Sequence, residues 1–158
     1  RQMFPKANVP IVPLSMQNHA GPEHAWRVGQ ALASLTQHNI WVVASGNITH
    51  NLRDWQVAAM GNGQTPDYVH RFADWVHDKL QAHEVEALIQ YRQGSADGRQ
   101  AHPSEDHLLP LFVALGAAGD AAQPQAFFRG VSDYVISMDG YGFTSRFSQG
   151  AQPSSALV

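Results

Sequence analysis

Two histidine-bearing stretches hold the side chains best suited to chemistry. The first is "ASGNITHNLR", residues 44–53, which carries His50 between two asparagines and follows the apolar run "IWVV". Histidine can act as an acid, a base or a metal ligand near neutral pH. Asn47 and Asn51 can hydrogen-bond a ligand or their own backbone, and Gly46 permits backbone conformations closed to other residues. The stretch is therefore either a site at the end of a strand or a polar turn whose asparagines satisfy the backbone.

The second stretch is "HPSEDHLLPL", residues 102–111. Ser104 is a good helix N-cap, so His107 falls in the first turn, on the apolar stripe of the predicted helix, and its ring is expected to point inward. A helix N-terminus disfavours imidazolium, and a neutral ring can bind a metal while a neighbouring carboxylate such as Asp106 orients it. The alternative is a core histidine with one satisfied hydrogen bond. His102 precedes the helix and is expected in an exposed loop.

Composition limits the partners and cofactors. The formal net charge is −3 with no basic cluster, so the electrostatic footprint of a nucleic-acid-binding protein is absent. The apolar runs are too short to span a bilayer, and no signal-peptide pattern opens the chain, so we expect a cytoplasmic protein without a membrane partner. With no cysteine and nine histidines, a metal site has to use imidazole and carboxylate ligands, which suits zinc or non-haem iron.

The elements that position these stretches read as an α/β fold. Residues 9–16 are β-branched and apolar, and they predict a short strand near a sheet edge. A helix is expected to start at Pro22 and to run to Asn39, a plausible left-handed cap. Residues 40–44 are continuously apolar, as in a strand covered on both faces. Strand, helix and strand predict a βαβ unit in a mixed, largely parallel central sheet flanked by helices.

The remainder of the chain fits the same single domain. Val69, Phe72, Val76 and Leu80 form the stripe of an amphipathic helix, and two further helices and two strands are expected after it. Pro110 is awkward inside a helix, so the helix of the second stretch either bends there or has a regular part that starts later. Residues 144–158 read as a loose tail.

Four stretches together resemble one family. They are "FPKANVPIVPLSM", "ASGNITHNLR", "HPSEDHLLPLFVALGAAG" and "ISMDGYGF", and they span the chain from about Phe4 to Phe143. In order and spacing they resemble the class III extradiol ring-cleavage dioxygenases, in the branch that is similar to DOPA 4,5-dioxygenase.

The resemblance implies a mononuclear, non-haem metal site that opens a catechol ring with dioxygen. Ferrous iron is implied for catalysis, and zinc is able to occupy the same imidazole site. His107 matches the family's late metal-binding histidine. His50 matches the acid–base catalyst beside the metal, which is sometimes counted as an additional ligand. Asn47, Asn51 and Asp106 are expected, by proximity, to contact the substrate or the ligands.

Members of the family are longer than this chain, and the resemblance implies that residues 1–143 are the C-terminal portion of one catalytic domain, truncated at the N-terminus. Two further histidine ligands are expected from the missing N-terminal portion, so the chain is expected to be inactive alone. An exposed sheet edge favours self-association or pairing with an N-terminal fragment. Two alternatives stay open, namely a non-catalytic binding or structural module with the same fold, and a zinc-dependent hydrolase without a recognisable motif.

Overall fold

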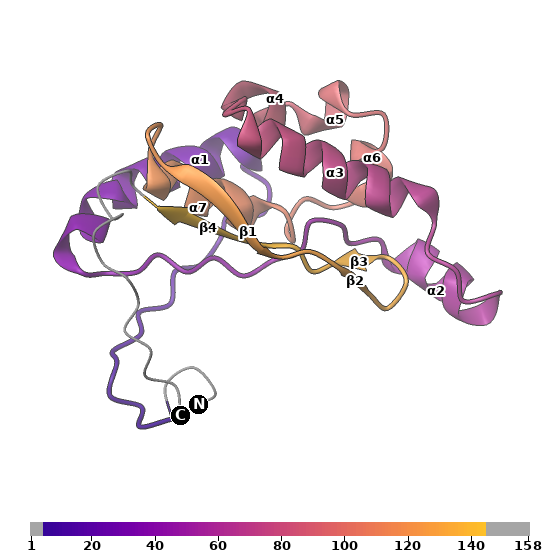
Figure 1. The fold of residues 1–158 in the computed structure, drawn as a ribbon, viewed down its shortest axis with the longest axis horizontal. Coiled ribbons are helices and arrows are strands. Elements are labelled where there is room, and N and C mark those ends of the chain that lie inside the picture. The colour runs from indigo at the N-terminus through magenta and orange to yellow at the C-terminus, as the bar shows by residue number, and fades with distance from the viewer. Residues whose placement is uncertain (1–4, 145–158) are drawn as a thin grey trace.

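Helices make up most of the secondary structure in the computed structural model, which describes residues 5–144 (Figure 1). The helices are α1 (Gly21–Leu32), the 3₁₀ helix η1 (Ala33–His38), α2 (Leu52–Met60), α3 (Asp67–Gln81), α4 (Val85–Ile89), α5 (Tyr91–Gly94), α6 (Gly98–Ala101) and α7 (Leu109–Ala118). The strands are β1 (Gln123–Phe128), β2 (Val131–Ser132), β3 (Ile136–Ser137) and β4 (Gly140–Thr144). Within this part of the chain, no helix combines the length and the apolarity needed to cross a membrane.

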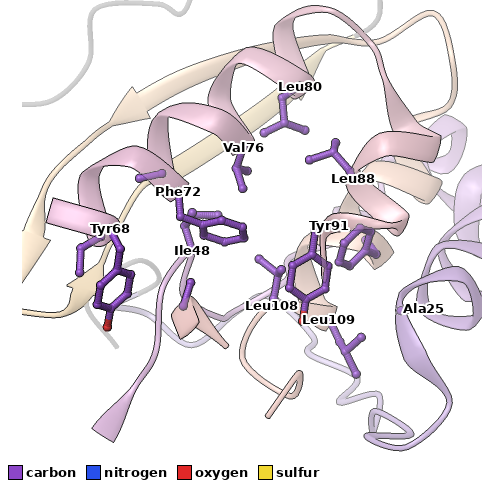
Figure 2. Packing of buried hydrophobic residues seen from close by; sticks show 14 of the residues in the cluster. Ala25, Ile48, Tyr68, Phe72, Val76, Leu80, Leu88, Tyr91, Leu108 and Leu109 are labelled. Atoms are coloured by element: carbon purple, nitrogen blue, oxygen red, sulfur yellow. The ribbon is translucent and has the colours of Figure 1, made fainter. Parts of the chain in front are cut away.

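Helix α3 organises the core. The predicted stripe of Val69, Phe72, Val76 and Leu80 is confirmed, since all four side chains are at most 2% exposed. Figure 2 shows Phe72, Val76 and Leu80 of this stripe facing side chains from later segments, namely Leu88, Tyr91, Leu108 and Leu109. One face of α3 thus joins α4, α5 and the start of α7 in a single hydrophobic cluster, and the opposite face is left to polar side chains.

Helices α1 and α7 pack so closely that neither tolerates a side chain at the contact. A Cβ on Gly29 would lie 2.2 Å from the carbonyl oxygen of Val113, and one on Gly116 would lie 2.1 Å from that of Trp26. The predicted start of α1 at Pro22 is confirmed, and Asn39 is left-handed with φ 57°. Helix α7 begins at Leu109, with Pro110 in its first turn, where proline costs no hydrogen bond.

The two segments predicted as paired strands, 9–16 and 40–44, are not strands in the described structure. In the second segment, Val42 packs against the core, whereas Trp41 and Val43 are 76% and 72% exposed. The first is more exposed still, with Val12 at 89%. Both segments therefore have the apolar side chains of sheet strands. Residues 5–144, however, supply neither a neighbouring strand to hydrogen-bond with them nor an element that packs over their exposed side chains.

The predicted largely parallel sheet is accordingly not formed by the described residues. Strand β1 pairs with β4 and β2 pairs with β3, and both pairings are antiparallel. The coarser prediction of a mixed helix and strand fold is confirmed. The predicted tail, 144–158, lies outside the described residues except for Thr144, which ends β4.

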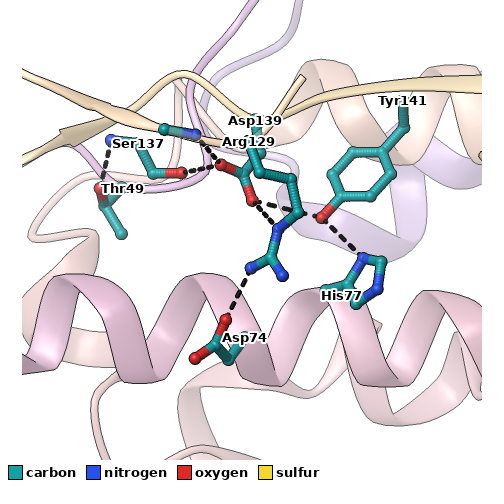
Figure 3. Close-up of polar contacts among 8 residues, drawn as sticks. Thr49, Asp74, His77, Arg129, Ser137, Asp139 and Tyr141 are labelled. Atoms are coloured by element: carbon teal, nitrogen blue, oxygen red, sulfur yellow. Dashed lines mark hydrogen bonds and ion pairs between the residues drawn. The ribbon is translucent and has the colours of Figure 1, made fainter. Parts of the chain in front are cut away.

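A polar network attaches the two small sheets to α3 (Figure 3). Arg129 donates to Asp139 from Nε at 2.8 Å and to Asp74 on α3 from an Nη at 2.7 Å. The Asp139 side chain is 3% exposed, and it also accepts hydrogen bonds from the Gly130 amide and the Ser137 hydroxyl. Ser137 in turn donates its backbone N–H to the Thr49 hydroxyl at 2.7 Å. The network therefore reaches from the surface of α3 to the segment that carries His50.

Candidate active site

The two histidines singled out from the sequence lie face to face. The rings of His50 and His107 stack with centroids 3.5 Å apart and planes 17° from parallel. The two come from segments that are far apart in the chain, between η1 and α2 and just before α7. Both side chains are partly exposed, and that of His107 is 38% exposed.

Backbone hydrogen bonds hold the His50 segment between two others. On one side, the amide of Asn47 donates to the carbonyl of His107 and the amide of His50 donates to the carbonyl of Ala101, both at 2.9 Å. On the other side, the amide of Ile48 donates to the carbonyl of Ser137 at 3.0 Å. The buried Thr49 hydroxyl adds a bond to the carbonyl of Val135 at 2.7 Å. These three amides bond to three different parts of the fold. The position of the His50 backbone is therefore set by the structure around it.

Gly46 is required here because of a close backbone approach. A Cβ at this position would lie 2.2 Å from the carbonyl oxygen of His107 and 3.2 Å from Cγ of Pro110. The sequence identified the glycine as special, but expected conformational freedom to be the reason. The structure gives contact with the His107 backbone instead, which any side chain at residue 46 would push away.

Asn51 caps a helix that the sequence reading missed. Its side-chain oxygen accepts the backbone N–H of Asp54 at 3.1 Å, and its side-chain nitrogen donates to the Gln100 carbonyl at 2.8 Å and to the Asp54 carboxylate at 3.1 Å. This is the N-cap of α2, and an Asn followed three residues later by an acid is the signal that would have found it. With these bonds made, Asn51 ties the site to α2 and α6.

Asn47 and Asp106 make different contacts near the pair. Asn47 directs its side-chain nitrogen at the sulfur of Met138, 3.2 Å away. A carboxylate oxygen of Asp106 lies 3.3 Å from Nε2 of His107. Asp106 also lines an open hollow together with Asn18, His19 and Arg92. Of the predicted site residues, Asp106 thus lies beside the His107 ring, and Asn47 is held nearby by the bond from its amide to the His107 carbonyl.

Electrostatics favour a neutral His50. Burial lowers the pKa of this imidazole, and the adjacent His107 ring lowers it further, whereas Asp106 acts in the opposite direction. A hydrogen bond from Ser104 is the main cause that lowers the pKa of Asp106, and the His107 ring contributes in the same direction. The site thus combines an ionised carboxylate with a His50 ring that is free to accept a proton near neutral pH.

His102 is buried, and its expected place in an exposed loop was wrong. The side chain is 0% exposed, and its Nε2 lies 2.8 Å from the carbonyl oxygen of Ile48. Burial is the main cause that lowers the pKa of His102 to about 4. No local pattern indicates this burial, because the apolar environment of the ring is made by Phe72 of α3 and Tyr91 of α5, which lie elsewhere in the chain.

The donor atoms suit part of a metal site. Imidazole nitrogens and a carboxylate are ligands for zinc or non-haem iron. Within the described ranges, however, no group of three or more His, Asp or Glu side chains is arranged to hold a metal ion. The described residues therefore offer fewer than the three protein ligands that a site of this kind normally has.

Comparison with known proteins identifies the family. A family model described as the catalytic LigB subunit of aromatic ring-opening dioxygenase matches residues 1–144. The chain belongs to this LigB family. The resemblance to class III extradiol dioxygenases drawn from the sequence is thereby confirmed.

The relatives of this LigB chain include plant and bacterial proteins named 4,5-DOPA dioxygenase extradiol. The protein from Mirabilis jalapa is 33% identical over 143 residues, and that from Beta vulgaris is 30% identical over 143 residues; each alignment covers 90% of this chain and 52% of the relative. The Escherichia coli K12 protein is 32% identical over 119 residues. The crystal structure of an uncharacterized E. coli K12 protein matches with a TM-score of 0.77 at 29% identity, over 89% of this chain and 57% of that one. The chain spans about half the length of the curated relatives it matches.

Replacing Gly46 tests its close approach to the His107 backbone. We expect Gly46→Ala to lower the free energy of unfolding by about 1–3 kcal/mol, because the new methyl group forces the 46–50 segment away from His107. Urea unfolding measures the loss. Gly94→Ala is the matched control, since a Cβ there meets Trp75 at an ordinary 3.6 Å. Equal stability of the two variants would contradict the assigned contact.

His102 predicts a loss of stability in acid. Its pKa is lowered from 6.5 to about 4 by folding, so below pH 6.5 the unfolded chain binds a proton that the folded chain does not. The stability from this group is complete above pH 6.5 and falls as pH drops toward 4, by about 3 kcal/mol in all. Urea unfolding at several pH values measures this. His102→Gln cannot titrate, so the stability of the wild type relative to this variant should fall by about 3 kcal/mol between pH 7 and pH 4, and parallel curves would refute the assignment.

Proposed function

We propose that this chain forms part of an extradiol dioxygenase catalytic domain that cleaves a catechol with dioxygen. The observation that carries the proposal is the stacked pair of His50 and His107, brought together in a chain of the LigB family. The names of the relatives make DOPA the first catechol to test. Because the chain covers about half of those relatives, the activity is proposed for a longer protein that contains it.

We assign His107 as a metal ligand and His50 as the acid–base residue. Imidazole lone pairs lie in the plane of the ring, so two rings that lie face to face cannot both direct them at one point. This arrangement supports one ligand and one neighbouring base over two ligands. Asp106, which lies 3.3 Å from Nε2 of His107, is proposed as the carboxylate that orients this metal-binding histidine. Asn47 is proposed as a substrate contact, and Asn51 as a residue that holds the site to α2.

The chemistry assigned to this chain is proton transfer beside a metal. A bound ferrous ion supplies Lewis acidity toward the catechol oxygens and the redox chemistry of dioxygen, and zinc is proposed to fit the same imidazoles without the redox step. A neutral ring nitrogen of His50 accepts a proton from a catechol hydroxyl and returns it as the ring opens. Both oxygen atoms enter the product, so no further reductant is needed.

We further propose that the rest of the domain completes both the metal site and the sheet. Two more histidine ligands are proposed from outside this chain, since the described residues offer fewer than the three ligands expected. Segments 9–16 and 40–44, with apolar side chains exposed, are proposed to become strands of a largely parallel sheet when the remaining strands are present. The isolated chain is then inactive.

Oxygen uptake and metal analysis test the assigned roles. In the longer protein loaded with iron, we expect His50→Ala to lower kcat by a factor of about 10²–10⁴ while much of the metal stays bound. His107→Ala should lose the metal. His70→Ala, at an exposed position on α3, is the control and should match the wild type. No uptake by the wild type across a panel of catechols would refute the dioxygenase proposal and favour a non-catalytic module.

Self-association tests the proposed sheet surface. We expect the isolated chain to form oligomers in sedimentation velocity, because Val12 and Trp41 expose apolar area without ladder partners. The double variant Val12→Lys and Trp41→Lys should shift the population toward monomer. Met60→Lys is matched in exposure, at 81%, but lies at the end of α2, away from both segments, and should have no such effect. A wild-type monomer at every concentration would contradict the proposal.

A further inference from the structure

His102 is buried in a place where an apolar side chain would pack as well. Its ring lies edge-on between Phe72 of α3 and Tyr91 of α5, with centroids 5.8 and 6.0 Å away. Nδ1 is buried and has no hydrogen-bond partner within residues 5–144. An unpaired buried nitrogen costs free energy that leucine or methionine would not cost. The ring is therefore poorly explained by packing alone, and an unsatisfied buried group of this kind calls for a reason.

The one polar contact that the ring makes leads to the His50 segment. Nε2 of His102 lies 2.8 Å from the carbonyl oxygen of Ile48, two residues before His50. A carbonyl can only accept, so the proton is on Nε2 and Nδ1 carries the bare lone pair. The ring is neutral, as its burial requires.

This contact is one of three hydrogen bonds that join residues 47–50 to residues 101–107. The amide of Asn47 bonds to the His107 carbonyl, and the amide of His50 bonds to the Ala101 carbonyl. The bond from His102 to Ile48 lies between them along the chain. The first two join backbone atoms and do not depend on the identity of a side chain. Of the three, the bond from His102 is the one that a residue type controls.

We propose that His102 is a positioning residue, which holds the His50 ring over His107 by donating a hydrogen bond from Nε2 to the Ile48 carbonyl. This inference rests on the proposed role of His50 in proton transfer. It assigns to His102 no contact with substrate or metal. Without the donor, the 47–50 segment is free to move relative to the segment that ends in His107, and the stacked geometry is lost before the fold is.

Two substitutions separate the donor from the shape of the ring. His102→Gln keeps an N–H donor at similar reach, whereas His102→Met keeps a similar volume without a donor. If packing alone matters, methionine should serve at least as well as glutamine. If the donor matters, glutamine should rescue the geometry and methionine should not.

The measurement is NMR spectroscopy of the metal-free chain, which needs no turnover. In the wild type and in His102→Gln, we expect ring-current shifts of the His50 and His107 protons from the stacked rings. In His102→Met, these shifts should be lost and the His50 amide should exchange about tenfold faster, as for the loss of one hydrogen bond. His70→Met makes the same change at an exposed position and should leave these signals unchanged.

Three results would overturn the proposal. The first is a folded His102→Met variant with wild-type shifts and exchange. The second is equal loss in His102→Gln and His102→Met. The third is a measurement on the wild type that does not depend on the variants, namely ring ¹⁵N chemical shifts that place the proton of His102 on Nδ1. Because these readouts come from the metal-free chain, they are independent of whether any catechol is cleaved, so failure of the dioxygenase proposal is recognised separately.

Discussion

The candidate site depends on how tightly the 46–50 segment is held against its neighbours. Gly46 leaves no room above the His107 carbonyl, and the next residues bond to the 101–107 segment on one side and to β3 on the other. Such a segment has few alternative positions, because moving it leaves buried amides and carbonyls without partners. The segment that carries His50 is thus held mainly by backbone contacts, to which the His102 side chain adds one, and these contacts connect it to α6, to the start of α7 and to β3.

That dependence explains why the polar network of Figure 3 matters for the site. Asp139 gathers Arg129, Gly130 and Ser137, and Ser137 passes the connection to Thr49. Networks of this kind are specific because each member has a fixed number of donors and acceptors. The network holds β3 in the position in which the Ser137 carbonyl accepts the hydrogen bond from the Ile48 amide.

Local patterns predicted the local structure well, and the helix of Val69, Phe72, Val76 and Leu80 is the clearest case. They also selected His50 and His107, whose proximity no local pattern can show, and the resemblance to a family supplied the pairing. The failures have a common cause. Residues 40–44 read as a buried strand because they are apolar, but burial depends on partners that the described residues lack. His102 read as exposed because it lies in a polar stretch, although α3 and α5 enclose it. Asn51 was noted as polar but not as the cap that starts α2.

The stacked pair has a consequence for assembly. Its two rings come from distant parts of the sequence, so they meet only after the long-range contacts of the chain have formed. If the proposed metal is held by His107 in this geometry, it binds the folded chain and not the unfolded one, and it then shifts the folding equilibrium by mass action. On that proposal, capture of the metal and folding of the chain are thermodynamically linked, so the amount of folded chain depends on the concentration of free metal.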